Sequence, residues 1–194
     1  MTQQVLIMGI LKNKTVAIIL AVILVIASTL LATHVKLGNK VNEITEGFYS
    51  GINYDGYLHP SVFTQLKNIS SSCLGISTIA MEYGIDTTAL NDARSHLETN
   101  LDGKAGNIKE LYANYSELRT VATQVINELK TKTLNDRDQT GFAQYQTNYD
   151  GAIATIESSG YNESVSSFIN GPYHSFPANI LAKLSGVKAP AYFA

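Results

Sequence analysis

The chain has 194 residues, of which 45% are hydrophobic, and its formal net charge is −2. This length fits one domain with an appendage, and the single cysteine, Cys73, excludes an intrachain disulfide. Four of the 14 basic residues and none of the 16 acids lie in residues 1–40, so residues 41–194 carry a net −6 without a basic cluster. A phosphate-backbone binder needs such a cluster, so nucleic acid is not expected as a partner.

The first element is the sequence "TVAIILAVILVIASTLLATHV", residues 15–35, in which no side chain is formally charged if His34 is neutral. At 1.5 Å per residue a helix of this length matches the bilayer core of about 30 Å. The alternative is a cleaved signal peptide, whose apolar core is usually shorter. We therefore expect an N-terminal tail at 1–14, a single-pass transmembrane anchor at 15–35 that contacts the lipid bilayer, and a helical-bundle domain at 36–194.

The orientation of this anchor is not decided by its flanks. Two lysines precede the apolar stretch and two follow it, Lys12, Lys14, Lys36 and Lys40, so the positive-inside rule discriminates little. The acid-free N-terminal segment and its α-amine favour an N-terminus inside the cell. We expect a cell-membrane protein with most of the chain extracytoplasmic, and the cytoplasmic orientation remains the alternative.

The segments after the anchor have helical spacing. The apolar pattern continues through Phe48, and the Gly-, Asn- and Pro-containing stretch 50–60 is expected to be a loop. A helix is expected from a Ser61 cap to a stop at Gly84, with Cys73 as a small buried hydrophobe. The next helix is expected to start at an Asp86 cap and to end near Gly103.

The clearest helix is "NIKELYANYSELRTVATQVINELK". Its apolar residues alternate at spacings of 3 and 4 over three heptads, which is typical of bundle or coiled-coil packing. They form the predicted bundle seam: Ile108, Leu111, Tyr115, Leu118, Ala122, Val125 and Leu129.

The segment "DRDQTG", residues 136–141, resembles the first half of a calcium-binding EF-hand loop. Thr147 stands where that loop needs a carboxylate, so we favour a turn in which Asn135 helps to stop one helix and Thr140 starts the next. A calcium site is the alternative. A last long helical segment is expected to follow, up to Phe168.

The C-terminal stretch 171–194 is expected to fold back. Gly171 and Pro172 should stop the preceding helix, the chain should reverse at Phe176–Pro177, and residues 178–184 should form a short helix. Tyr173 and Phe176 are expected to plug the end of the bundle.

The same residues carry a family resemblance. Residues 153–194 resemble the end of LemA-family proteins in a set of residues with matching order and spacing: Tyr161, Asn162, Val165, Phe176, Pro177, Asn179, Ile180, Ala182, Gly186, Tyr192 and Phe193. Residues 41–150 match only diffusely: the family's basic, Ile-Pro-Asn-rich start of the second helix is missing, and Ser-Ser-Gly precedes Tyr161. The resemblance implies a divergent member of a mostly bacterial family of membrane-anchored helical bundles, with no catalytic residues.

The predicted fold is all-α: an antiparallel up-and-down bundle of long helices attached to one N-terminal transmembrane helix. The four histidines are scattered, and apart from the calcium alternative at 136–141 no pattern indicates a catalytic, cofactor-binding or metal site. We expect a non-enzymatic scaffold or interaction module without a cofactor, which acts through an unknown protein partner or as a homo-oligomer. The alternative is an extracytoplasmic ligand-binding sensory bundle whose pocket uses Tyr112, Tyr115, Tyr145 and Tyr149.

Overall fold

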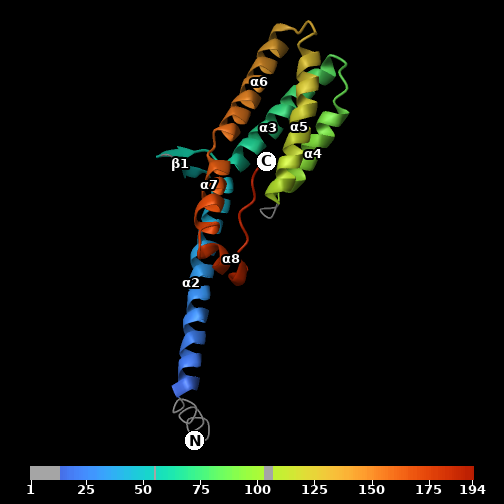
Figure 1. Cartoon of the computed structure of the whole chain (residues 1–194). Helices are drawn as coiled ribbons and strands as arrows, with labels where there is room; N and C mark the ends of the chain where they lie inside the picture. The colour runs from blue at the N-terminus through green and yellow to red at the C-terminus, as the bar shows by residue number, and fades with distance from the viewer. Residues whose placement is uncertain (1–13, 55, 103–106) are drawn as a thin grey trace, which may run out of the picture. The chain divides into compact units, whose positions relative to one another are not determined.

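The computed structural model describes residues 14–54, 56–102 and 107–194, and the fold is all-α (Figure 1). The expected N-terminal tail, 1–14, lies outside the described residues except for Lys14. The helical elements, in chain order, are α2 (Lys14–Ser50), α3 (Val62–Glu82), α4 (Thr88–Asp102), α5 (Ile108–Leu129), α6 (Asp136–Glu157), α7 (Tyr161–Phe168), a π-helical turn η1 (Ile169–Tyr173) and α8 (Ala178–Ser185).

The chain divides into two compact units. The first, here called the bundle unit, consists of Glu43–Ser167 and Pro190–Ala194. The second, here called the α2–α8 unit, consists of Met1–Asn42 and Phe168–Ala189. In this division, residues 168–189, which include most of the expected fold-back segment, belong to the same unit as residues 1–42.

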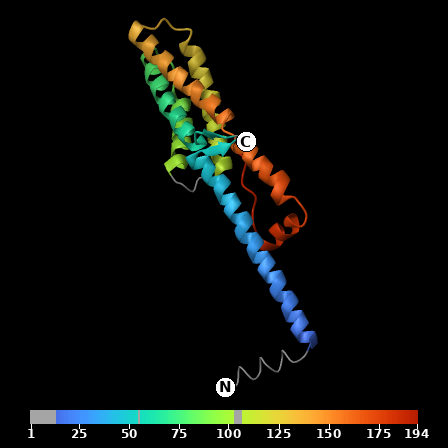
Figure 2. The same cartoon turned by 90° about the vertical axis from the view of Figure 1, so that its left-hand side faces the viewer.

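The bundle unit is built from four long helices that run side by side (Figures 1 and 2). Helix α3 packs against α4, α5 and α6, and α4 packs against α5. All seven residues of the seam that the heptad spacing predicts on α5 are buried. Short connections between these helices make neighbours antiparallel, as expected for an up-and-down bundle.

The ends of α3 follow the residues that the sequence indicates. The Ser61 hydroxyl accepts a hydrogen bond from the backbone N–H of Thr64 at 2.9 Å, which satisfies one of the free donors of the first turn. Gly84, with φ +71°, follows the last turn in the left-handed conformation. Asp86 accepts from the backbone N–H of Thr88 at 2.9 Å just before α4.

The start of α6 corrects the expected turn at "DRDQTG". The helix begins at Asp136 rather than at Thr140, because Asn135 is its N-cap and accepts a hydrogen bond from the backbone N–H of Asp138 at 2.9 Å. The Asp138 carboxylate also accepts from the Tyr83 hydroxyl at 2.9 Å and from the Asn135 amide at 2.7 Å. These contacts tie the end of α3 to the start of α6 and occupy the carboxylate.

A β-hairpin occupies the stretch expected to be a loop. Strands β1 (Ile52–Tyr54) and β2 (Tyr57–His59) pair antiparallel, with Ile52 opposite His59. Gly51 enters it at φ +95°, and a Cβ there would lie 2.5 Å from the carbonyl oxygen of His59, so only glycine fits. Strands of three residues are too short to show a period-2 pattern in the sequence.

The last long helical segment is interrupted. Helix α6 ends at Glu157 and α7 starts at Tyr161, with Gly160 at φ +70° between them. A left-handed residue cannot continue a right-handed helix. The break therefore gives Tyr161 and Asn162 the first turn of a new helix.

In the α2–α8 unit, helix α2 exposes its apolar residues. Ile18, Leu24 and Leu31 are 63%, 66% and 66% exposed. Within the described chain, α2 is the one helix long and apolar enough to cross a membrane. The helix ahead of Gly171 ends in η1, where Gly171 has non-helical φ/ψ, and α8 forms the short helix expected after Phe176–Pro177.

Candidate functional site

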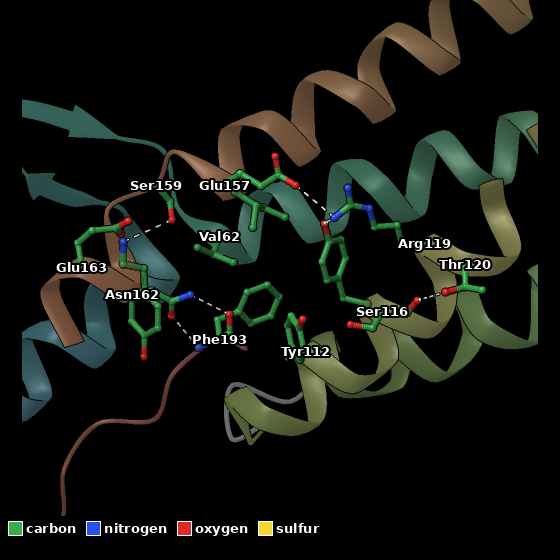
Figure 3. A pocket seen from close by; sticks show the side chains of 13 residues that line it. Val62, Tyr112, Ser116, Arg119, Thr120, Glu157, Ser159, Asn162, Glu163 and Phe193 are labelled. Atoms are coloured by element: carbon green, nitrogen blue, oxygen red, sulfur yellow. Dashed lines mark hydrogen bonds and ion pairs between the residues drawn. The ribbon is translucent and has the colours of Figure 1, made fainter. Parts of the chain in front are cut away.

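The candidate site lies where the start of α7 meets the C-terminal residues of the chain, within the bundle unit (Figure 3). The Asn162 amide nitrogen donates to the carbonyl oxygen of Phe193 at 2.9 Å, and the Phe193 backbone N–H donates to the Asn162 amide oxygen at 2.9 Å. The Tyr161 hydroxyl donates to the carbonyl oxygen of Ala191 at 2.7 Å. We call this arrangement the C-terminal clamp. Its two side chains hold the backbone of residues 191–193.

The clamp places the Phe193 ring among aromatic side chains from other helices. Its centroid lies 5.5 Å from Phe48, 5.2 Å from Tyr112 and 5.5 Å from Tyr115. The Phe48 ring in turn meets Tyr161 edge to face at 5.3 Å. Such pairs add about 0.5–1.5 kcal/mol each beyond the area they bury. The C-terminal residues thus complete an aromatic cluster that joins α2, α5 and α7.

A cavity of about 380 Å³ opens beside this cluster. Its lining residues come from α3, α5, the end of α6 and α7, together with Phe193: Val62, Tyr112, Tyr115, Ser116, Arg119, Thr120, Ile156, Glu157, Ser159, Tyr161, Asn162, Glu163 and Phe193. A cavity of this volume fits a small molecule. Its walls combine aromatic faces with hydroxyl, carboxylate and guanidinium groups, so they favour a small amphipathic or polar ligand.

One ion pair lies on the wall of the cavity. The Arg119 guanidinium is 3.2 Å from the Glu157 carboxylate and donates to the Tyr115 hydroxyl at 3.5 Å (Figure 3). Burial raises the pKa of Tyr115 and, more strongly, that of Tyr161. Both phenols therefore stay protonated at neutral pH: Tyr161 donates to the carbonyl oxygen of Ala191, and Tyr115 accepts from Arg119.

The four tyrosines expected in one pocket do not share a site. Tyr112 and Tyr115 line the cavity, whereas Tyr145 lines a separate surface hollow on α3 and α6. Tyr149 is buried, with its hydroxyl 3.5 Å from the carbonyl oxygen of Arg119, and burial raises its pKa. The expected pocket is therefore corrected to one that combines Tyr112 and Tyr115 with Arg119.

The family-motif residues differ in burial and do not share one site. Tyr161 and Val165 are buried, and Asn162 belongs to the clamp. The prediction that Phe176 plugs the bundle is wrong, because its side chain is 81% exposed. Pro177 is exposed. Tyr173 is half-buried, and its hydroxyl donates to the carbonyl oxygen of Val187 at 3.0 Å within the α2–α8 unit. The aromatic residue that enters the bundle is Phe193.

Cys73 is buried, as expected, and burial raises the pKa of its thiol to about 12. Such a thiol is a poor nucleophile, because the reactive form is the thiolate. In the residues that the structure describes, no group of three or more His, Cys, Asp and Glu side chains is placed to hold a metal ion.

Sequence reasoning missed the pairing of Arg119 with Glu157, whose positions are 38 residues apart on different helices. It also missed the role of Phe193, although the closing aromatic of the family resemblance was a signal for it. Comparison of the chain with models of protein families, with characterised proteins and with solved structures finds no match.

Proposed function

We propose that the protein is a non-enzymatic, single-pass membrane protein of LemA-like type, whose helical bundle acts as a scaffold or interaction module. The observation that carries the proposal is the change of exposure along α2. Apolar side chains as far as Val35, which is 50% exposed, face outward, whereas Leu37, Ile44 and Phe48 are at most 7% exposed. Exposed apolar surface of this extent is stable in lipid and costly in water.

The bundle unit supports a structural role. Polar side chains join its elements, as in the network of Tyr83, Asn135 and Asp138 and in the C-terminal clamp. Strand β2 of the hairpin also exposes two large apolar side chains, Tyr57 and Leu58, at 74% and 77%. Such side chains are a candidate contact for a protein partner or for a second copy of the chain.

The anchor is tested by membrane partition of the full chain. Val25→Arg places a charge in the middle of the apolar stretch, which costs about 2.5–3.5 kcal/mol at the centre of a bilayer. We expect wild type and the matched control Val25→Leu to stay in the membrane fraction after alkaline extraction, with the mass of the full-length chain. Val25→Arg should be extracted. A soluble product that has lost its first residues would instead show a cleaved signal sequence.

The orientation is tested by thiol labelling in intact cells. Asp136→Cys, at the exposed start of α6, is combined with Cys73→Ala, and the wild type with its buried Cys73 sets the background. An extracytoplasmic bundle predicts labelling by a membrane-impermeant maleimide without permeabilisation. Labelling only after permeabilisation would place the bundle in the cytoplasm.

Self-assembly is tested by light scattering of the full chain in mild detergent. A scaffold that forms homo-oligomers predicts a mass of two or more chains after subtraction of the detergent. A monomer at all concentrations contradicts this part of the proposal and leaves the anchor untouched.

A second candidate function is ligand binding in the cavity beside Arg119, because aromatic, hydroxyl and charged groups converge there. A thermal-shift screen of small polar and amphipathic metabolites tests it. We expect a true ligand to stabilise wild type and the exposed control Gln124→Phe, but not Ser116→Phe, which fills the cavity. If no compound stabilises wild type, or if the two variants respond equally, the cavity is not the binding site.

A further inference from the structure

An apolar stripe lies on α8 and does not face the protein. Ile180 and Leu184, which are 50% and 67% exposed, lie four residues apart on one side of α8, and Phe176, just ahead of the helix, is 81% exposed. These three side chains form the apolar stripe. Phe176 is the most exposed of the large apolar side chains in the described chain. Ala182, on the opposite side of α8, is buried, so the side chains of Ile180 and Leu184 point away from their own unit.

The end of α8 is fastened to the end of the apolar stretch of α2. His34 Nδ1 lies 2.9 Å from the carbonyl oxygen of Ser185, the last residue of α8. A carbonyl oxygen only accepts, so Nδ1 carries the proton in this hydrogen bond. His34 is the penultimate residue of the uncharged stretch 15–35, and both partners belong to the α2–α8 unit.

The C-terminal cap of α8 fixes the position of the Ser185 carbonyl oxygen that contacts His34. Gly186 adopts the left-handed conformation at φ +74°, and the backbone N–H of Val187 donates to the carbonyl oxygen of Ala182 at 3.2 Å. The Tyr173 hydroxyl, ahead of α8, donates a hydrogen bond to the carbonyl oxygen of Val187, which follows α8. Both views show α8 beside α2 (Figures 1 and 2), so its exposed stripe lies close to the level at which the apolar part of α2 ends.

The charges of the two units are strongly unequal. Residues 1–42 and 168–189 contain six lysines and no Asp or Glu. Of the chain's 14 basic and 16 acidic residues, this leaves eight basic and all 16 acidic residues in the bundle unit. Exposed Lys183 and Lys188 flank the apolar stripe, and Lys36 and Lys40 follow the apolar stretch of α2. Cationic residues beside an apolar stripe are the pattern of a helix that binds anionic lipid headgroups.

We propose that α8 lies in the surface of the bilayer that α2 crosses, with Phe176, Ile180 and Leu184 inserted between the lipid headgroups. An interfacial helix of this kind buries its apolar face about 5–10 Å into the headgroup boundary. Lys183 and Lys188 extend their ammonium groups to the phosphates while their alkyl chains cover apolar surface. The inference rests on the proposed membrane anchor and adds a second lipid contact to it.

The depth of single nitroxide labels tests this inference in the full chain. Cysteines replace Leu184, Ile180, Leu24 or Met81, each in a Cys73→Ala background, and the protein is reconstituted in liposomes of phosphatidylcholine and phosphatidylglycerol. Collision rates with oxygen, which concentrates in lipid, and with a water-soluble nickel complex report the depth of each label. Leu24 marks the bilayer interior, and Met81, 54% exposed on α3, marks water.

We expect the labels at 180 and 184 to favour oxygen over nickel, at a depth between those of the two reference labels. If the label at 24 lies deep in the bilayer while the labels at 180 and 184 are as accessible to nickel as the label at 81, the α8 inference is overturned. The anchor is unaffected by that result. A label at 24 that is as accessible to nickel as the label at 81 overturns both the anchor and the α8 inference. Dipolar broadening between labels at 184, removed by dilution with unlabelled protein, would show that a second copy covers the stripe, which also overturns the inference.

The role of the lysines is tested by lipid composition. Labels at 180 and 184 should move toward water when phosphatidylglycerol is omitted, and the label at 24 should not move. An equal depth in both liposomes would overturn the headgroup contact of Lys183 and Lys188.

Discussion

Asn162 pairs with the backbone of Phe193 as a neighbouring β-strand would. Its amide donates to the carbonyl oxygen and accepts from the N–H of the same residue, both at 2.9 Å, across 31 positions of the chain. A single side chain thereby satisfies both backbone groups of a residue outside any helix or strand. The clamp explains why a Tyr-Asn pair stands in the first turn of α7.

The first prediction concerns the two phenylalanines of the C-terminal stretch. Phe193→Ala removes a buried ring from the aromatic cluster and should lower the free energy of unfolding by about 3–5 kcal/mol. Phe176→Ala, at an exposed position, should change it by less than about 0.5 kcal/mol. At 2–4 °C per kcal/mol, Phe193→Ala should lower the Tm by roughly 6–20 °C in detergent. Equal shifts for both variants would show that Phe193 does not close the bundle.

The second prediction concerns the polarity of the clamp. Asn162→Asp keeps the shape but turns the donor that faces the carbonyl oxygen of Phe193 into a second acceptor. We expect a loss of about 1–3 kcal/mol, the usual penalty for an unsatisfied polar group. Asn148→Asp, the same change at an exposed position of α6, is the control. A loss of the same size in both variants, measured by thermal unfolding at pH 7, would mean that the clamp contributes nothing.

The third prediction concerns the pH dependence of the α3–α6 connection. The hydrogen bond from the Tyr83 hydroxyl is the main cause that lowers the pKa of Asp138, with help from Asn135 and Arg137. A lowered folded-state pKa contributes stability above the ordinary value of about 3.9, and this is lost as the pH falls through the folded-state pKa. Wild type should therefore lose more stability than Asp138→Asn when the pH falls below about 4.

Tyr83→Phe serves as the second variant in that experiment. It removes the main cause of the shift, so its acid-dependent loss of stability should lie between those of wild type and Asp138→Asn. Parallel pH profiles of unfolding for all three proteins would contradict the assignment.

The fourth prediction concerns the reactivity of Cys73. With a pKa of about 12, its thiolate fraction at pH 8 is about one in ten thousand, and the folded protein also excludes the reagent. A maleimide should label wild type at least about 100-fold more slowly than Asp136→Cys in a Cys73→Ala background. In denaturant the two rates should become similar. Rapid labelling of folded wild type would show that α3 opens around Cys73.

The sequence predicts those parts of the fold that depend on local pattern. The 3–4 spacing from Ile108 to Leu129 predicts the buried face of α5, and Ser61 and Gly84 mark the ends of α3, because caps and periodicity depend on residues a few positions apart. The hairpin at residues 52–59 escaped prediction because its strands are too short for a pattern. Gly160 breaks a helix whose apolar spacing continues on both sides, so periodicity alone does not reveal the break.

The site itself was harder to predict. Phe176 and Phe193 are both aromatic residues near a proline, and only the hydrogen bonds of Asn162 decide which of them enters the bundle. Arg119 on α5 and Glu157 at the end of α6 lie 3.2 Å apart only in the folded bundle. Contacts of this kind depend on the tertiary arrangement of helices, and no local pattern in one sequence encodes them.

The placement of the clamp has a consequence for the entropy of the chain. Residues 168–189 leave the bundle unit after Ser167 and return to it at Pro190, so both ends of this segment are fixed to the same folded body. The closure entropy of such a loop rises only slowly with length, by about 0.6 kcal/mol for each doubling. The segment that carries α8 can therefore lengthen, shorten or change its sequence at little cost to the bundle, provided that residues 190–193 return to Tyr161 and Asn162.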